Sequence, residues 1–242
     1  RSSDLKYGNS PLADKILDDE VTDELDQFPH VIRTWLRQFR RTKHEGCAPI
    51  DGFIYRQDFQ AAFKSVHEKT SSSPSGIHYT FWKCIALDDE MSEYMAVMMR
   101  LPFVYGFVND RWAKCLDVML EKKKNVRQIH QMRIIVLFEA DFNTALKLFF
   151  AKQMIKNSEL SDLTDEQWGG RPGRTAHSPA LRKTLAFDYG RLMFITIAIF
   201  AHDAVANFDR MVPNISTLVV RQHHVEANLM TCRNKVMART EH

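Results

Sequence analysis

The most apolar stretch of the chain without a charged residue covers residues 192–202, which are 11 positions between Arg191 and Asp203. A helix needs roughly 20 apolar residues to span the hydrocarbon core of a bilayer. We therefore expect no transmembrane helix and no membrane partner. The 242 residues, 45% of them hydrophobic and 26% charged, are enough to bury a sizeable core. They predict one large or two small globular units.

Within this stretch, residues 194–201 are rich in β-branched and aromatic side chains and follow Gly190. Such a run predicts a strand that is buried on both faces. Asp203 would then stand at its carboxyl end, where an aspartate either caps a turn or binds a hard cation such as Mg²⁺. Asp209 does not complete such a site locally, because six extended residues would place it roughly 20 Å away.

The remaining pattern is mostly helical. Apolar spacing predicts helices near residues 31–41, 58–66, 79–86, 91–99, 142–150, 179–190 and 215–237. Residues 112–121 are a candidate extended run, and residues 133–138 suit a buried strand. Residues 70–76 consist of turn formers and give the strongest loop signal. The expected class is α+β, predominantly helical with a few strands.

Cysteine usage and charge limit the setting and the partners. Cys47, Cys84, Cys115 and Cys232 form no Cys-x-x-Cys pair, which favours a reducing, intracellular location in nucleus or cytoplasm. His44-x-x-Cys47 has half the spacing of a zinc site, but no second pair with ligand spacing follows. Residues 1–30 carry a net charge of −5 and residues 31–242 one of +8. This balance permits a polyanionic partner without demonstrating one.

Residues 167–174 form the segment Gln-Trp-Gly-Gly-Arg-Pro-Gly-Arg, which sets Arg171 and Arg174 in a glycine-rich turn. Exposed backbone and bidentate guanidinium donors can both approach phosphate there. The alternative interpretation is solvated loop charge. The segment does not match a P-loop, because the Gly-Lys-Ser/Thr ending is absent.

The order of these segments resembles the fingers and first palm segment of reverse transcriptases of the non-LTR (LINE-like) retrotransposon type. Residues 71–76 stand in the place of the family's Gly-Pro-Asp-Gly-like turn, and residues 112–122, ending Met-Leu-Glu-Lys, resemble its Leu-Ile-Pro-Lys strand. Residues 131–142, with Lys147 beyond, resemble its Tyr-Arg-Pro-Ile-Ser-Leu-Leu element. Residues 167–175 are similar to its Gln-Phe-Gly-Phe-Arg-x-Gly-Arg-Ser segment, and residues 203–213 to its first polymerase motif.

This resemblance implies roles for individual residues. Asp203 would be catalytic and would bind magnesium, and Phe208 would lie under the incoming sugar as a steric gate. Lys122 and Arg133 would hold the triphosphate of the nucleotide. The arginines of residues 167–174 would face the backbone of the template or primer.

The implied function is that of a fragment of an RNA-directed DNA polymerase. Its partners would be an RNA template, a DNA primer, deoxynucleotide triphosphates and the remainder of the parent polypeptide. The expected fold is a right-hand polymerase with a helical extension (1–69), a fingers-like region (70–190) and the start of a palm (191–242).

The sequence contains no Tyr/Phe-x-Asp-Asp motif, which in the family supplies the other metal-binding aspartates. We therefore expect Mg²⁺ to bind only with a complete palm, and this chain by itself to be inactive. The alternative is a non-enzymatic helical module that binds RNA or protein, such as a decayed element.

Overall fold

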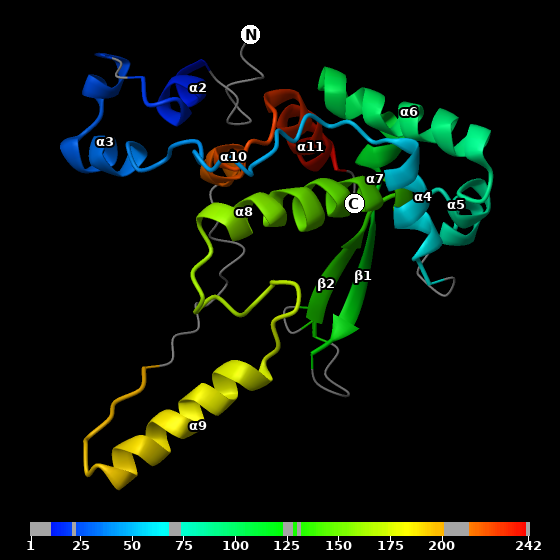
Figure 1. The fold of residues 1–242 in the computed structure, drawn as a ribbon. Coiled ribbons are helices and arrows are strands. Elements are labelled where there is room, and N and C mark those ends of the chain that lie inside the picture. The colour runs from blue at the N-terminus through cyan, green and yellow to red at the C-terminus, as the bar shows by residue number, and fades with distance from the viewer. Residues whose placement is uncertain are drawn as a thin grey trace.

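The computed structural model describes residues 11–20, 23–67, 74–122, 128–129, 132–200 and 213–240. Helices dominate this part of the chain, and a two-stranded antiparallel sheet stands beside them (Figure 1). The predicted α+β class is confirmed at this level. Within the described ranges, no helix is both long and apolar enough to cross a membrane.

The elements of the described residues alternate with connections of very different lengths, among them the long ones before α4, α9 and α10. In order they are α2 (Pro11–Leu17), η1 (Asp23–Gln27), α3 (His30–Leu36), α4 (Arg56–Lys64), α5 (Tyr79–Ile85), α6 (Asp89–Tyr105), η2 (Asp110–Ala113), β1 (Leu116–Glu121), β2 (Met132–Leu137), α7 (Ala140–Leu146), η4 (Lys147–Met154), α8 (Ile155–Ser161), α9 (His177–Leu192), α10 (Pro213–Gln222) and α11 (Ala227–Arg239). The helices α7 and α8 are joined by η4, which is a π-helix, into one long rod.

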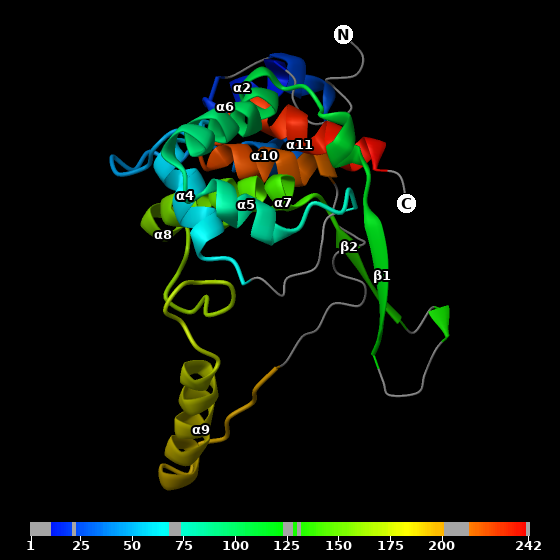
Figure 2. The ribbon, with the colours of Figure 1, turned by 90° about the vertical axis from the view of Figure 1, so that its right-hand side faces the viewer.

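Aromatic side chains from widely separated helices form the centre of the core. The Phe103 ring on α6 lies 5.2 Å from Trp112 and 5.0 Å from Phe149, measured between ring centroids. Phe63 on α4 stacks on Trp82 of α5 at 5.4 Å. Helix α11 packs against α6 and η2 and lies among the other helices in Figure 2. The C-terminal helix is therefore part of the same core.

The hairpin of β1 and β2 projects away from this helical body (Figure 2). Its register places Leu116 opposite Leu137 near the body and Glu121 opposite Met132 at the far end. The extended run predicted at residues 112–121 is a strand only from Leu116 onward, because residues 112–113 belong to the 3-10 helix η2. The second predicted strand is confirmed, but the burial expected for it is wrong. Its centre, Ile135, is 42% exposed. A two-stranded ribbon buries side chains only where another layer covers it, and among the described residues none covers β2.

The strand predicted at residues 194–201 is wrong over the part that the structure describes. Residues 195–200 have no regular secondary structure, and the side chains of Phe194 and Phe200 are 97% and 82% exposed. A β-branched run becomes a strand only where a neighbour supplies a hydrogen-bonding ladder. Here the Ile195 N–H instead donates to the Gly190 carbonyl at 2.9 Å, and the chain turns back along α9. Residue 201 lies outside the described residues.

Helix boundaries also differ from the predicted ones. The single helix expected at residues 215–237 is divided into α10 and α11, because His224 adopts a left-handed conformation with φ of 66°. Val225 then forms a parallel bridge with Ile50. Helix α6 extends beyond the predicted 91–99, from a cap in which Asp88 accepts from the Met91 N–H at 2.8 Å to a left-handed Gly106.

Candidate functional site

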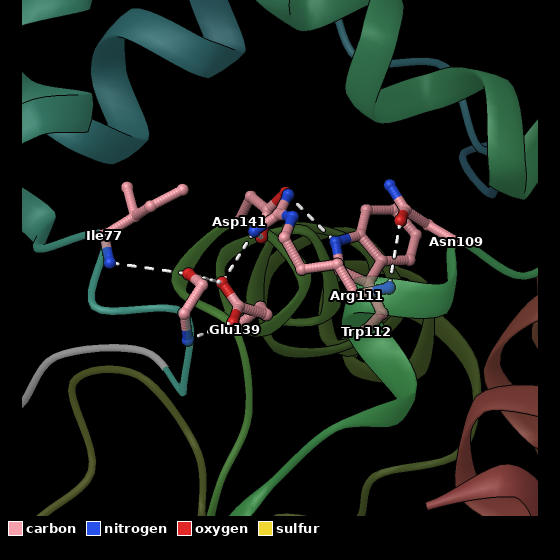
Figure 3. Close-up of polar contacts among 7 residues, drawn as sticks. Ile77, Asn109, Arg111, Trp112, Glu139 and Asp141 are labelled. Carbon is pink, nitrogen blue, oxygen red and sulfur yellow. Dashed lines mark hydrogen bonds and ion pairs between the residues drawn. The ribbon is translucent and has the colours of Figure 1, made fainter.

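A buried polar cluster holds the base of the β1–β2 hairpin (Figure 3). Arg111 lies in η2, before β1, and Glu139 and Asp141 follow β2. The Arg111 Nη1 atom donates to Glu139 Oε2 at 2.6 Å and to Asp141 Oδ1 at 3.2 Å, while its Nη2 pairs with Asp141 Oδ2. Trp112 Nε1 donates to the same Asp141 oxygen at 3.0 Å. We name Arg111, Glu139 and Asp141 the hairpin clamp.

The hairpin clamp also holds a loop from earlier in the chain. Ser75 donates from its backbone N–H to Glu139 Oε1 at 2.8 Å and from its Oγ to Glu139 Oε2 at 2.9 Å. Its Oγ in turn accepts from the Ile77 N–H at 3.4 Å. Ser75, which lies in the segment that the sequence identifies as a loop, is thus bonded to the base of the hairpin through Glu139.

The charges of the hairpin clamp indicate that its residues have a structural role and not an acid–base role in catalysis. Burial tends to lower the pKa of Arg111, but hydrogen bonding to Asp141 and the charges of Asp141 and Glu139 outweigh it, so the pKa is raised. Every carboxylate oxygen of Glu139 and Asp141 has a protein donor. Carboxylates with this many protein donors hold their neighbours in position.

Lys122 and Arg133 lie at the opposite, outer end of the hairpin. Arg133 on β2 is paired with Leu120 on β1, and Lys122 follows two residues beyond Leu120. Lys122 lies in a bend directly after the end of β1, so the register brings the two basic residues to the same outer end of the hairpin. Both are exposed. The phosphate site predicted for these two residues stays a prediction.

Arg171 is enclosed in its own loop. Its Nε donates to Glu159 Oε1 at 2.7 Å, its Nη2 pairs with Glu159 Oε2, and its Nη1 donates to the carbonyls of Thr164 and Gln167. Only 6% of the side chain is exposed. The hydrogen bond from Arg171 lowers the pKa of Glu159. Four of the five guanidinium donors are thus engaged within the protein, and direct contact with a nucleic acid would require breaking them.

Arg174 is more open than Arg171. Its Nη2 pairs with Asp165 at 3.1 Å, and its guanidinium carbon lies 5.0 Å from the centroid of the Trp168 ring. Arg182 of α9 lies at the same distance from that ring. The glycine-rich segment is therefore a folded turn in which cations surround one tryptophan, with 28% of the Arg174 side chain exposed.

The remaining predicted site residues, Asp203 and Phe208, lie outside the described residues. Within the described ranges, no group of three or more His, Cys, Asp or Glu side chains could hold a metal ion. The prediction that Asp203 binds magnesium therefore stays a prediction.

Three residues with the chemistry of a catalytic triad do not form one. Ser158 Oγ and Asp162 Oδ2 both lie 3.3 Å from the same atom, Nδ1 of His223. A triad needs the carboxylate on one ring nitrogen and the nucleophile on the other. The Ser158 hydroxyl also donates to the Met154 carbonyl at 3.0 Å. This arrangement therefore links helices and does not activate a serine.

The sequence analysis missed the hairpin clamp. A signal was present, because Glu139 and Asp141 interrupt an otherwise apolar passage from the predicted strand into the predicted helix. Carboxylates between two buried elements need a partner. The identity of that partner, Arg111, depends on the pairing of β1 with β2, which no local pattern reveals.

Comparison with known proteins adds no family to these observations. No protein-family model matches the chain, and no curated protein matches it. The function must be inferred from the residues and their geometry.

Proposed function

We propose that this chain is the fingers and first palm segment of an RNA-directed DNA polymerase of the retrotransposon type. The observation that supports it most is the projecting β1–β2 hairpin (Figure 2), which has Arg133 near its outer end and Lys122 directly after β1. The segments that resemble the reverse-transcriptase elements follow in the expected order, and two of them pair in this hairpin. The two basic side chains bind the triphosphate of an incoming nucleotide.

The part of this chain in the chemistry is binding and orientation. Lys122 and Arg133 supply fixed positive charge where negative charge develops during phosphoryl transfer. The hairpin clamp links the residue before β1 to the residues after β2 at the base of the hairpin. A magnesium ion, when bound, supplies electrostatic activation of the primer hydroxyl. Asp203 alone gives that ion one carboxylate, whereas an octahedral shell needs six oxygens, so the residues of this chain do not complete the site and we derive no step through it.

Titration with deoxythymidine triphosphate tests the proposal. The double variant Lys122→Ala/Arg133→Ala should weaken the dissociation constant of the nucleotide at least tenfold, since two charged hydrogen bonds are lost. The matched control, Lys64→Ala/Lys156→Ala, removes the same charge from α4 and α8 and should leave it within twofold. Equal weakening in both double variants would mean that net charge alone attracts the nucleotide, and the proposal would fail.

A second candidate is a non-enzymatic module that binds another protein. It is favoured by exposed apolar side chains on α9 and directly after it, where Leu192 is 77% and Phe194 97% exposed. Exposed apolar groups that lie together are typical of interaction surfaces. Binding of a partner protein by such a module would not depend on Lys122 and Arg133. The nucleotide titration therefore separates the two candidates.

A further inference from the structure

A pocket of about 290 Å³ lies between the end of α4, the start of α5 and the junction of α7 with η4. Its apolar wall includes Val66 and Leu148, and Tyr79 and Thr144 also line it. The rest of the lining consists of two lysines, Lys147 and Lys152, together with Ala62, Ser65 and His67. Pockets that bind small molecules are commonly of about 300 to 1,000 Å³, so this one has room for a small ligand.

The π-helix explains why both lysines reach the same pocket. In an α-helix each residue turns by about 100°, so residues five apart point in directions about 140° from each other. A π-helix instead bonds residue i to residue i+5, which brings residues five apart nearly into line. Lys147 and Lys152 are the first and sixth residues of η4. With α-helical geometry in this segment, the two ammonium groups would diverge.

Neither lysine forms an ion pair or hydrogen bond with another side chain in the part of the chain that the structure describes. Both are exposed, and no carboxylate among the described residues lines the pocket. Two positive charges in the same pocket repel each other, and a bound anion reduces that repulsion. Within the described part of the chain, the pocket therefore combines two lysines that have no carboxylate partner with an apolar wall.

We propose that this pocket binds a small organic phosphate. Two ammonium groups match the dianion that a phosphate monoester forms above its second pKa of about 6. The apolar wall receives the organic part, and Thr144 also lines the pocket. The site uses none of the residues of the proposed nucleotide site, so it stands independently of the proposed function.

Phenyl phosphate is the test probe, with its binding to the 242-residue chain followed at pH 7.5 by amide chemical shifts in α4 and η4. We expect saturable binding that is at least fivefold tighter than that of inorganic phosphate or benzoate. Lys147→Gln and Lys152→Gln should each weaken it about tenfold, as expected for loss of a charged hydrogen bond. Lys156→Gln, on exposed surface of the same rod, is the matched control and should change it less than twofold.

Two further variants keep the result interpretable. Ala62→Met, in the wall of the pocket, should abolish the advantage of phenyl phosphate over inorganic phosphate while the chain stays folded. Lys122→Ala/Arg133→Ala should leave phenyl phosphate binding unchanged, which separates this site from the hairpin. No saturable binding, or equal binding by the Lys147 and Lys156 variants, would overturn the proposal.

Discussion

Arg111 faces two buried carboxylates, and its guanidinium is the cation that balances them. The side chains of Glu139 and Asp141 are 1% and 4% exposed, whereas that of Arg111 is 29% exposed. A buried carboxylate that loses its cation keeps its desolvation cost without the compensating attraction. Much of the stability of the hairpin base therefore depends on one residue.

We predict that Arg111→Met lowers the free energy of unfolding by about 2 to 3 kcal/mol. This loss is at or below the lower end of the roughly 3 to 5 kcal/mol typical of a broken buried ion pair, because water reaches part of the site. Urea denaturation measures the change. Arg56→Met is the matched control, since its partner Asp89 lies 3.5 Å away and both side chains are exposed. That variant should cost less than about 0.5 kcal/mol. A similar loss in both variants would contradict the assignment of the hairpin clamp.

At the scale of elements, the loop after α8 depends on a contact within itself. Arg171 draws together the end of α8, through Glu159, and two carbonyls of the following turn. Gly170 and Gly173 have φ of 75° and 72°, so the turn uses conformations that favour glycine. The same glycines and arginine that suggest phosphate binding in the sequence are thus also what this turn needs to fold.

We predict that Arg171→Ala opens this loop, with amide hydrogen exchange of residues 164–171 accelerated at least tenfold. The guanidinium of Arg171 donates hydrogen bonds to backbone carbonyls that would otherwise be hydrogen-bonded to water in an open loop. Arg174→Ala should leave that exchange within twofold, because Arg174 contacts only side chains through its guanidinium. If the Arg174 variant exchanged as fast as the Arg171 variant, Arg171 would have no special role in ordering the loop.

The sequence predicted helices and strands correctly where the local residue pattern and the tertiary environment favour the same structure. The periodicity of α4 is one case, since Phe59 and Phe63 are buried as their spacing predicts. Residues 194–200 have an equally strong β pattern and form no strand, because a strand depends on a neighbour distant in sequence. The π-helix of residues 147–154 has helical periodicity that does not distinguish it from α, so the shared pocket of Lys147 and Lys152 was not visible in the sequence.

At the scale of the whole molecule, distant parts of the chain meet around Asn157. Its amide nitrogen donates to the carbonyls of Ala48 and His223, each at 2.9 Å, and its Oδ1 accepts from the Ala48 N–H at 3.2 Å. His223 extends this junction through its ring to Ser158 and Asp162. A change of charge at His223 therefore affects the contacts that join three segments of the chain.

We predict that the protein loses stability as the pH falls below about 6.5, and that His223 is a cause. Burial lowers the pKa of His223, and the charge of His224 lowers it further, against the opposing effect of Asp162. The unfolded chain then takes up a proton near pH 6.5 while the folded protein does not, so protons favour unfolding by up to about 1.4 kcal/mol per pH unit.

Urea midpoints measured from pH 7.5 to 5.5 should decline for the unaltered chain and decline less for His223→Gln. His30→Gln, which changes an exposed histidine at the start of α3, should keep the original slope. If His223→Gln showed the same decline as the unaltered chain, acid sensitivity would have to arise from other groups, and the junction at Asn157 would not be its origin.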